Sequence, residues 1–402
     1  MTALSRTAQA IRASVFAELA ARIEAHARSG GDLVHLHLGD THVVPPDDAR
    51  FGLVERAGQD EMDGALYRYG AIPGLDTLKQ VFAARLGRAN LGPLAVDPGR
   101  HVLVGAGATH AIFCALRAVL DPGDEVLVAS PYWPLSVGVV RAAGGVPVEV
   151  PLTTRLYAEP TLDPAAVLAE AITPRTRAVY LITPNNPDGY VLDSAQLKSI
   201  GALAMARDLW ILSDEVYSDY VYEGAHASIG RLDGMAERTI SAYSLSKSHA
   251  LAGVRVGFVV APEPVVSLAR RVSTHTVFNV PVASQRVALA ALSSTDAWLA
   301  RSREACRAAR DATLRALEGS DVRVHVPRGG SYVFVDFASI LGGRPLRALL
   351  ERAIDHGVLL APGDGCGAAF ATWARICFTS VPPPRLLEGI ARLRRAIDET
   401  RA

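Results

Sequence analysis

Three lysines stand beside thirty-eight arginines in this chain, and Lys247 has the sequence context best suited to covalent chemistry. A lysine can exchange its ammonium for an imine with an aldehyde. Lys79 and Lys198 lie in amphipathic stretches and are expected on solvated helical faces. Lys247 follows a β-branched and aromatic run, stands among small hydroxyl residues and precedes a strand-like segment at residues 256–260. A lone lysine is more often a solvated side chain, so its neighbours must decide.

A glycine-rich segment, Gly105–Thr109, follows a predicted strand and opens a predicted helix. Free backbone N–H groups at the start of a helix, together with the positive end of the helix dipole, attract phosphate. The same glycines would also suit an ordinary tight turn between a strand and a helix. On this segment alone, a phosphate site and a plain turn are equally good interpretations.

Aromatic, amide and carboxylate side chains follow three further predicted strands, at the edge where ligands of α/β sheets collect. Tyr132 and Trp133 could stack on a flat heteroaromatic ring, or could merely pack a proline-rich loop. Asn185 and Asn186 lie in a turn between two prolines. Asp214 ends a buried strand, where a carboxylate is costly unless it meets a cation or hydrogen-bond donors. Capping of the following helix is the alternative for Asp214.

These residues together suggest a phosphorylated pyridine that is tethered to a lysine. Arg255 lies eight residues after Lys247 and could contact the same phosphate. A protonated pyridine nitrogen would partner Asp214. Pyridoxal 5′-phosphate (PLP) combines an aldehyde, a pyridine and a phosphate, and lysine holds it as a Schiff base. Each signal is modest alone, but their shared placement at strand ends is difficult to obtain by accident.

The sequence resembles the class I/II aminotransferases of the aspartate aminotransferase superfamily, PLP fold type I. The resemblance runs from Gly39 to Arg375, and its most specific parts are SLSKSHALAGVRVGF and the upstream SDEVY. It implies an α/β fold whose large domain holds a mostly parallel seven-stranded sheet, with a small α+β domain built from both chain ends. It also implies a homodimer that transfers an amino group between an L-amino acid and a 2-oxo acid, with pyridoxamine phosphate as an intermediate.

Position by position, the resemblance implies a role for each residue that would hold PLP. Lys247 would form the Schiff base and act as the base, and Asp214 would pair with the pyridine nitrogen. Tyr217 and Asn186 would hydrogen-bond the phenolic oxygen, while Trp133, rather than its neighbour in the same turn, would stack on the ring. The phosphate contacts would come from Gly107, Ala108, Thr109, Ser244, Arg255 and, from the neighbouring subunit, Tyr69.

The resemblance also implies a substrate corner and shows two departures from the family pattern. Arg375 would bind the substrate α-carboxylate in a bidentate pair, and Gly39 and Asn186 would line the same corner. The usual Asn-Pro-Thr-Gly turn has Asp188 in place of threonine, which an aspartate is expected to tolerate. The usual acidic-proline pair is changed at residues 40–42. Side chains that could line a selective pocket, or could equally be structural, are His35, His37, His42 and Tyr332.

Two alternatives stand beside transamination. C–S lyases and aminocyclopropane carboxylate synthases resemble the same motif set, and fold alone does not decide the reaction. Regulators with an aminotransferase-like domain carry an additional N-terminal DNA-binding domain, and with roughly forty residues before Gly39 in this sequence such a regulator is not expected. Strict aspartate specificity is disfavoured, because THTVFNVP lacks the arginine that the dicarboxylate-specific branch supplies from the neighbouring subunit.

The elements that must position these residues alternate along the middle of the chain. Between about residues 100 and 260, apolar strand-like runs alternate with helical patterns, which predicts a parallel α/β sheet covered on both faces. Strands are predicted at residues 102–104, 125–129, 178–182, 210–212, 239–242 and 256–260. Helices are predicted at residues 108–120, 163–171 and 194–207.

After about residue 295 the pattern changes to an α+β one. Arginine-rich amphipathic helices are predicted at 296–317 and 384–399, with strands between them at 322–326, 331–336 and 374–378. The length of 402 residues favours two domains. The expected division is a large PLP-binding domain at 46–295 and a small domain formed by 1–45 and 296–402.

Composition narrows the range of partners. The chain has 41 basic and 41 acidic residues without a basic block, so no nucleic-acid partner is expected. The four cysteines have the spacing of neither a zinc site nor a disulfide framework, so no metal is expected. Glu18 and Glu24 argue against a secretory signal, and no uncharged segment could span a membrane. The expected location is the cytoplasm, and the expected partners are small substrates and a second copy.

Overall fold

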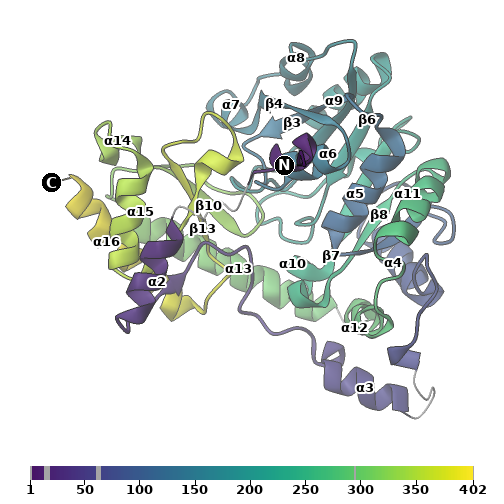
Figure 1. The fold of residues 1–402 in the computed structure, drawn as a ribbon, viewed down its shortest axis with the longest axis horizontal. Helices are drawn as coiled ribbons and strands as arrows, with labels where there is room; N and C mark the ends of the chain where they lie inside the picture. Colours follow the sequence, from purple (N-terminus) through teal and green to yellow (C-terminus); the bar gives the residue numbers. More distant parts are fainter. Residues whose placement is uncertain (1, 13–18, 60–64, 294–295, 402) are drawn as a thin grey trace.

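The computed structural model describes residues 2–12, 19–59, 65–293 and 296–401. Within these ranges the largest element of the fold is a seven-stranded sheet (Figure 1). Its strand order is β2-β8-β7-β6-β5-β3-β4. β8 runs antiparallel to both of its neighbours, and the other pairs are parallel. The predicted mostly parallel sheet is therefore confirmed. The strands are β2 (Val102–Ala106), β3 (Glu125–Ser130), β4 (Val146–Pro151), β5 (Thr176–Ile182), β6 (Trp210–Asp214), β7 (Thr239–Ser244) and β8 (Val256–Val260).

One strand of this sheet, β4, is missing from the sequence-based prediction. It contains Pro147 and Pro151, which argue against a strand when the sequence is read alone. In the structure β4 pairs with β3 and forms an edge of the sheet. An edge strand tolerates proline because one side of its backbone needs no ladder hydrogen bond.

Helices cover both faces of the sheet, as the alternation of strands and helices predicts. Val126 and Val128 of β3 pack in one cluster with α5, α6 and α11, whereas Leu127 between them packs on the opposite face with α8 and α9. α4 and α12 cover the same opposite face over β2 and β8. These helices are α4 (Asp76–Arg88), α5 (Ala108–Val119), α6 (Ser136–Ala142), α8 (Pro164–Ala169), α9 (Ser194–Ala206), α11 (Glu263–Thr276) and α12 (Val282–Ser293).

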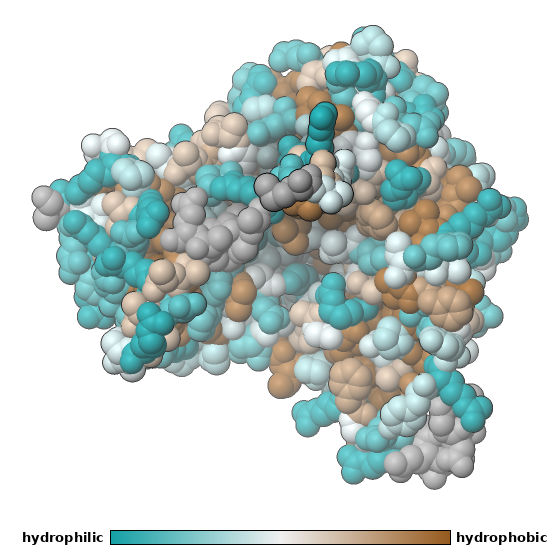
Figure 2. Space-filling model, viewed as in Figure 1, coloured by the Kyte–Doolittle hydropathy of each residue, from teal (hydrophilic) through white to brown (hydrophobic). Residues whose placement is uncertain are grey.

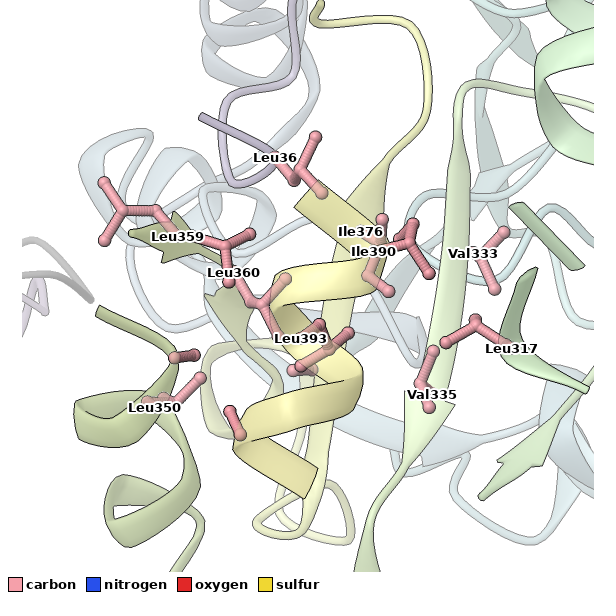
Figure 3. Close-up of a cluster of buried hydrophobic side chains, with 14 of the residues drawn as sticks. Leu36, Leu317, Val333, Val335, Leu350, Leu359, Leu360, Ile376, Ile390 and Leu393 are labelled. Carbon is pink, nitrogen blue, oxygen red and sulfur yellow. The ribbon is translucent and has the colours of Figure 1, made fainter. Parts of the chain in front are cut away.

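A second, smaller core joins the two ends of the chain. The four-stranded antiparallel sheet has the order β12-β13-β10-β9, and β1 pairs in parallel with β11. Figure 3 shows Leu36 from the N-terminal segment beside Ile376 and Ile390 of the C-terminal part. The strands are β1 (Val34–His35), β9 (Arg323–Val324), β10 (Tyr332–Asp336), β11 (Val358–Leu359), β12 (Ala361–Pro362) and β13 (Trp373–Cys377).

The remaining helices pack around the large sheet and the smaller core. α1 lies beside α6 of the large sheet, although residues 34–36 belong to the smaller core. The division at residues 46 and 295 stays a prediction. No helix within the described ranges is long and apolar enough to cross a bilayer. The helices are α1 (Arg6–Gln9), α2 (Ala20–Arg28), α3 (Phe51–Gln59), α7 (Thr153–Ala158), α10 (Leu245–Ser248), α13 (Asp296–Leu317), α14 (Ala338–Leu341), α15 (Leu346–Asp355) and α16 (Pro383–Arg401).

The prediction for Lys79 is wrong, whereas Lys198 is exposed on α9 as expected. Lys79 of α4 is only 3% exposed, and its ammonium lies 2.8 Å from Asp76 Oδ1. A lysine stem can pack against apolar neighbours while its charged end reaches a carboxylate three residues away on the same helix. The four cysteines are buried free thiols, in agreement with the sequence: Cys114, Cys306, Cys366 and Cys377.

Candidate active site

A cavity of about 340 Å³ lies where the parallel strands end and faces residues of the smaller core. Most residues assigned from the resemblance line it. Gly107 adjoins the cavity through its neighbour Ala108, whereas Tyr69 is 85% exposed and packs edge-on against Phe278. The assigned residues that line the cavity are Gly39, Ala108, Thr109, Trp133, Asn186, Asp214, Tyr217, Ser244, Lys247, Arg255 and Arg375.

Lys247 lies between the two strands that the sequence predicts on either side of it, and the structure adds a short helix there. β7 ends at Ser244, whose Oγ accepts a hydrogen bond from Ser246 N (3.0 Å) and so starts the short helix α10. Lys247 is half-buried on this helix, and its ammonium donates to the carbonyl oxygen of Gly39. The geometry holds a lysine amine inside the cavity with a neutral partner.

Asp214 ends β6 and is 4% exposed. Tyr180 Oη and Val216 N each donate to it at 3.3 Å, and neither donor carries a charge. Burial raises the pKa of Asp214 to about 7, because removal from water disfavours the carboxylate. No cationic side chain in the described part of the chain forms an ion pair with it. A cationic ligand would restore its charge.

The start of α5 forms an open corner for an anion. Gly107 is its N-cap with φ 79°, no side chain in the described part of the chain caps the helix, and the first turn holds no acidic residue. A Cβ on Gly107 would lie 2.4 Å from an Arg255 guanidinium nitrogen, and one on Gly257 would lie 2.2 Å from Ala108 N. Glycines at both positions therefore let the arginine and β8 approach the free N–H groups.

Arg375 of β13 forms a second, buried corner. Its Nη1 donates to Asn186 Oδ1 (3.0 Å) and its Nη2 to the carbonyl oxygen of His37 (3.0 Å). Its guanidinium lies 4.3 Å above the ring of Tyr332, whose hydroxyl is 2.8 Å from that of Tyr217. Within the described residues, Arg375 Nε has no hydrogen-bond partner. A buried guanidinium held by neutral groups is suited to the carboxylate of a ligand.

The structure also separates the candidates between which the sequence left a choice. Trp133 lines the cavity, whereas Tyr132 is buried beside it and donates its backbone N–H to Cys366 O (2.9 Å). Of the four candidates for a selective pocket, Tyr332 lines the cavity. His42 instead contacts the carbonyl oxygen of Thr379 through Nδ1 (3.0 Å). The rings of His35 and His37 lie near each other at a tilt of 44°, with centroids 5.3 Å apart, and it is the backbone carbonyl of His37 that contacts Arg375.

Sequence reasoning missed several residues of the site. Tyr180, which donates to Asp214, stands two residues before the end of β5, and its register partner Leu212 is two residues before Asp214. Tyr180 and Leu212 thus lie at the same distance from their strand ends, and this match between the two predicted strands is the sequence signal that could have identified Tyr180. The others are small or apolar and look like core residues in the sequence: Ile112, Leu135, Ile182, Val216, Ser246 and Ala252.

The donor set matches PLP group by group. An anion corner, an amine and an uncompensated carboxylate lie around one cavity with an aromatic ring at its wall. Phosphate suits the N–H groups of Ala108 and Thr109 and the guanidinium of Arg255. The aldehyde suits Lys247, and the pyridinium suits Asp214. The residues present therefore fit this cofactor.

Known proteins agree with this geometry. The family model described as aminotransferase class I and II matches residues 44–393. Over 371 residues, 92% of each chain, the sequence is 33% identical to an aspartate/prephenate aminotransferase of Thermus thermophilus. It is 35% identical to an arginine–pyruvate transaminase of Pseudomonas aeruginosa over 88% of each chain. The structure of aspartate aminotransferase from Thermus thermophilus with maleate matches with a TM-score of 0.87, 31% identity and coverage of 98% of this chain and 100% of that one. The chain belongs to the aminotransferase class I and II family and is an aminotransferase that uses PLP.

Proposed function

We propose that Lys247 is the residue that holds PLP covalently, and that the cavity transfers amino groups between an L-amino acid and a 2-oxo acid. When bound, PLP supplies an electron sink for the α-carbon of an amino acid. The observation that supports this assignment best is Asp214, a buried carboxylate whose raised pKa calls for a cationic partner beside Lys247. Tests with single amino acids should yield one 2-oxo acid per site and pyridoxamine phosphate; release of a leaving group without that conversion would contradict transamination.

Each side chain would have a separate task. Lys247 Nζ would take the α-proton of the substrate and later return a proton, while Asp214 keeps the pyridine nitrogen charged. Tyr217 and Asn186 would hydrogen-bond the phenolic oxygen of the ring, and Trp133 would stack on its face. Gly107, Ala108, Thr109, Ser244 and Arg255 would hold the phosphate.

The substrate would enter with its α-carboxylate on Arg375, beside Gly39 and Asn186. We expect Arg375→Lys to lower kcat/KM by roughly 10²- to 10³-fold through KM, because lysine cannot form the bidentate pair in a buried corner. Steady-state kinetics and the PLP dissociation constant would be measured together. A change confined to PLP binding would contradict the assignment.

We further propose a homodimer in which Tyr69 reaches the phosphate of the other subunit. Tyr69 is highly exposed and does not line the cavity of its own chain. Other large apolar side chains nearby are also exposed, among them Phe51, Tyr67 and Phe278. Brown atoms gather where α12 meets the projecting segment that carries α3 (Figure 2). A second copy covering this region would remove that apolar surface from water.

Hybrid dimers test whether Tyr69 acts across the interface. Tyr69→Ala should weaken PLP binding about tenfold or more, since it removes a hydrogen bond to a charged phosphate. A dimer that pairs a Tyr69→Ala chain with a Lys247→Ala chain should regain one site of native PLP affinity. That site combines the intact Lys247 of the first chain with the intact Tyr69 of the second. Tyr67→Ala is the matched control, and a hybrid without rescue would contradict the proposal.

The substrate side chain and the location are proposed only coarsely. The named relatives act on aspartate, prephenate, arginine and pyruvate, so the proposal extends to L-amino acids as a class. The four buried free thiols suit a reducing compartment, which supports the cytoplasm.

A further inference from the structure

Asp188, which replaces the usual threonine, is a buried residue and not a solvated turn aspartate. It is 1% exposed, and its carboxylate accepts three hydrogen bonds. Oδ1 accepts from Asn185 Nδ2 (2.8 Å) and from Tyr190 N (3.1 Å), and Oδ2 accepts from Thr153 Oγ1. A carboxylate enclosed in this way costs free energy, so the arrangement requires a structural reason.

The carboxylate connects loops that follow three adjacent strands. β4, β3 and β5 are neighbours in the sheet. Thr153 begins α7 just after β4, and Asn185 and Asp188 lie in the turn after β5. The second N–H of the Asn185 amide donates to Pro131 O (2.9 Å), in the turn after β3. Both protons of one amide therefore tie Asp188 to the turn of Pro131.

Two of these loops carry residues of the proposed active site. The turn that contains Pro131 continues to Trp133, which lines the cavity. Asn185 precedes Asn186, whose Oδ1 accepts from Arg375 Nη1 at 3.0 Å. A shift of the Asn185 amide would therefore move the wall beside the cofactor ring and the holder of the substrate arginine together.

An aspartate suits this position better than the threonine that the family pattern predicts. A carboxylate offers two oxygens with about four acceptor directions, whereas a hydroxyl offers one oxygen with two. Threonine at 188 would leave a buried N–H or O–H group without its acceptor. Burial raises the pKa of the Asp188 carboxyl. The groups that contact Asp188 from α7 and from its own loop are neutral: Thr153, Tyr157, Asn185 and Tyr190.

We propose that Asp188 is a positioning residue, which fixes the turn of Trp133 relative to the pair formed by Asn186 and Arg375. In this role it sets the tilt of the cofactor ring with respect to the substrate carboxylate, without touching either. The inference rests on the proposed function of the cavity, because it assigns the ring to Trp133 and the carboxylate to Arg375.

Substitutions of Asp188 give the primary test. We expect Asp188→Thr to retain PLP on Lys247 but to change the visible circular dichroism of the bound cofactor, which reports its orientation. It should lower kcat/KM about 10²-fold, as expected for a displacement near 1 Å. Asp188→Asn should stay within about threefold of the native enzyme, because its Oδ1 still accepts both N–H bonds and Thr153 can reverse its hydroxyl.

A second pair of variants tests the network if Asp188→Thr fails to fold. Thr153→Val removes one donor to the carboxylate at nearly constant shape and should lower kcat/KM about tenfold, with the same change in circular dichroism. Thr153→Ser keeps the hydroxyl and should preserve both quantities. Equal behaviour of Thr153→Val and Thr153→Ser would overturn the proposal.

Asp193→Ala is the matched control. Asp193 is an exposed aspartate at the start of α9, where its Oδ1 accepts from Ala195 N and Gln196 N at 2.9 Å. Its loss should lower Tm by a few degrees yet leave circular dichroism and kcat/KM unchanged. Native circular dichroism and kcat/KM in folded Asp188→Thr would overturn the positioning role. Absence of PLP from Lys247 in the native enzyme would overturn the proposed function instead, so the two failures are distinct.

Discussion

Replacing Lys247 by alanine is expected to abolish covalent attachment of PLP and to lower turnover by at least about 10⁴-fold, the upper range for loss of a positioned acid–base group. The side chain has two proposed tasks, imine formation and proton transfer, and alanine can perform neither. The Lys247 ammonium contacts Gly39 O inside the cavity. Among the described residues that line the cavity there is no second lysine that could replace it. Borohydride reduction followed by peptide mapping would measure the attachment, and steady-state kinetics would measure turnover.

Two further variants separate chemistry from charge. Lys247→Arg keeps a cation near Gly39 O, but a guanidinium stays protonated and cannot form an imine with an aldehyde. This variant should therefore be as inactive as Lys247→Ala. Lys198→Ala removes an exposed lysine of α9 and should leave attachment and turnover unchanged. A reduced PLP adduct on a peptide other than that of Lys247, or turnover retained in Lys247→Ala, would contradict the assignment.

The arrangement of the site could be predicted to the extent that it follows from strand ends. Asp214 ends one strand that the apolar pattern identifies, and Asn186, Trp133 and Lys247 each follow another. Parallel strands place their carboxyl ends at one edge of a sheet, so separate segments converge without any knowledge of side-chain contacts. The cavity contains all four, which confirms this step of the reasoning.

The contacts between neighbouring elements could not be predicted in the same way. Tyr180 and Asp214 meet across β5 and β6, and Asp188 meets Thr153 across two loops. A sequence pattern gives the faces of one element at a time, but not the register between two. The prediction that Lys79 is exposed was wrong for a related reason: the hydrophobic period of α4 does not reveal which neighbouring elements pack over its polar side. The strand β4 was not predicted because its prolines are permitted only at the edge of a sheet, and edge position depends on the arrangement of all the strands.

Replacing Asp214 by asparagine should leave PLP on Lys247 but lower turnover by about 10²- to 10³-fold, the range for removal of one preorganised electrostatic group. Asparagine has nearly the same shape and can keep the contacts with Tyr180 and Val216, so the change isolates the charge. Cofactor content and steady-state turnover would be measured on the same preparation. Unchanged turnover would contradict the role of Asp214 in keeping the pyridine cationic.

Asp214→Asn should raise the thermal stability of the protein without cofactor, although it lowers the turnover of the protein with cofactor. The folded-state pKa of Asp214 is raised from 3.8 to about 7, so the unfolded chain releases its proton first as pH rises. Stability from the protonated carboxyl is therefore fully present below about pH 4 and is lost as pH rises through about 7. Apo Asp214→Asn should match the native apoprotein near pH 4 and exceed its Tm at pH 8, whereas with PLP bound the native protein should have the higher Tm. Thermal unfolding of both proteins with and without PLP would measure this reversal. A native apoprotein as stable as the variant at pH 8 would mean that the carboxylate already has a cationic partner within the chain.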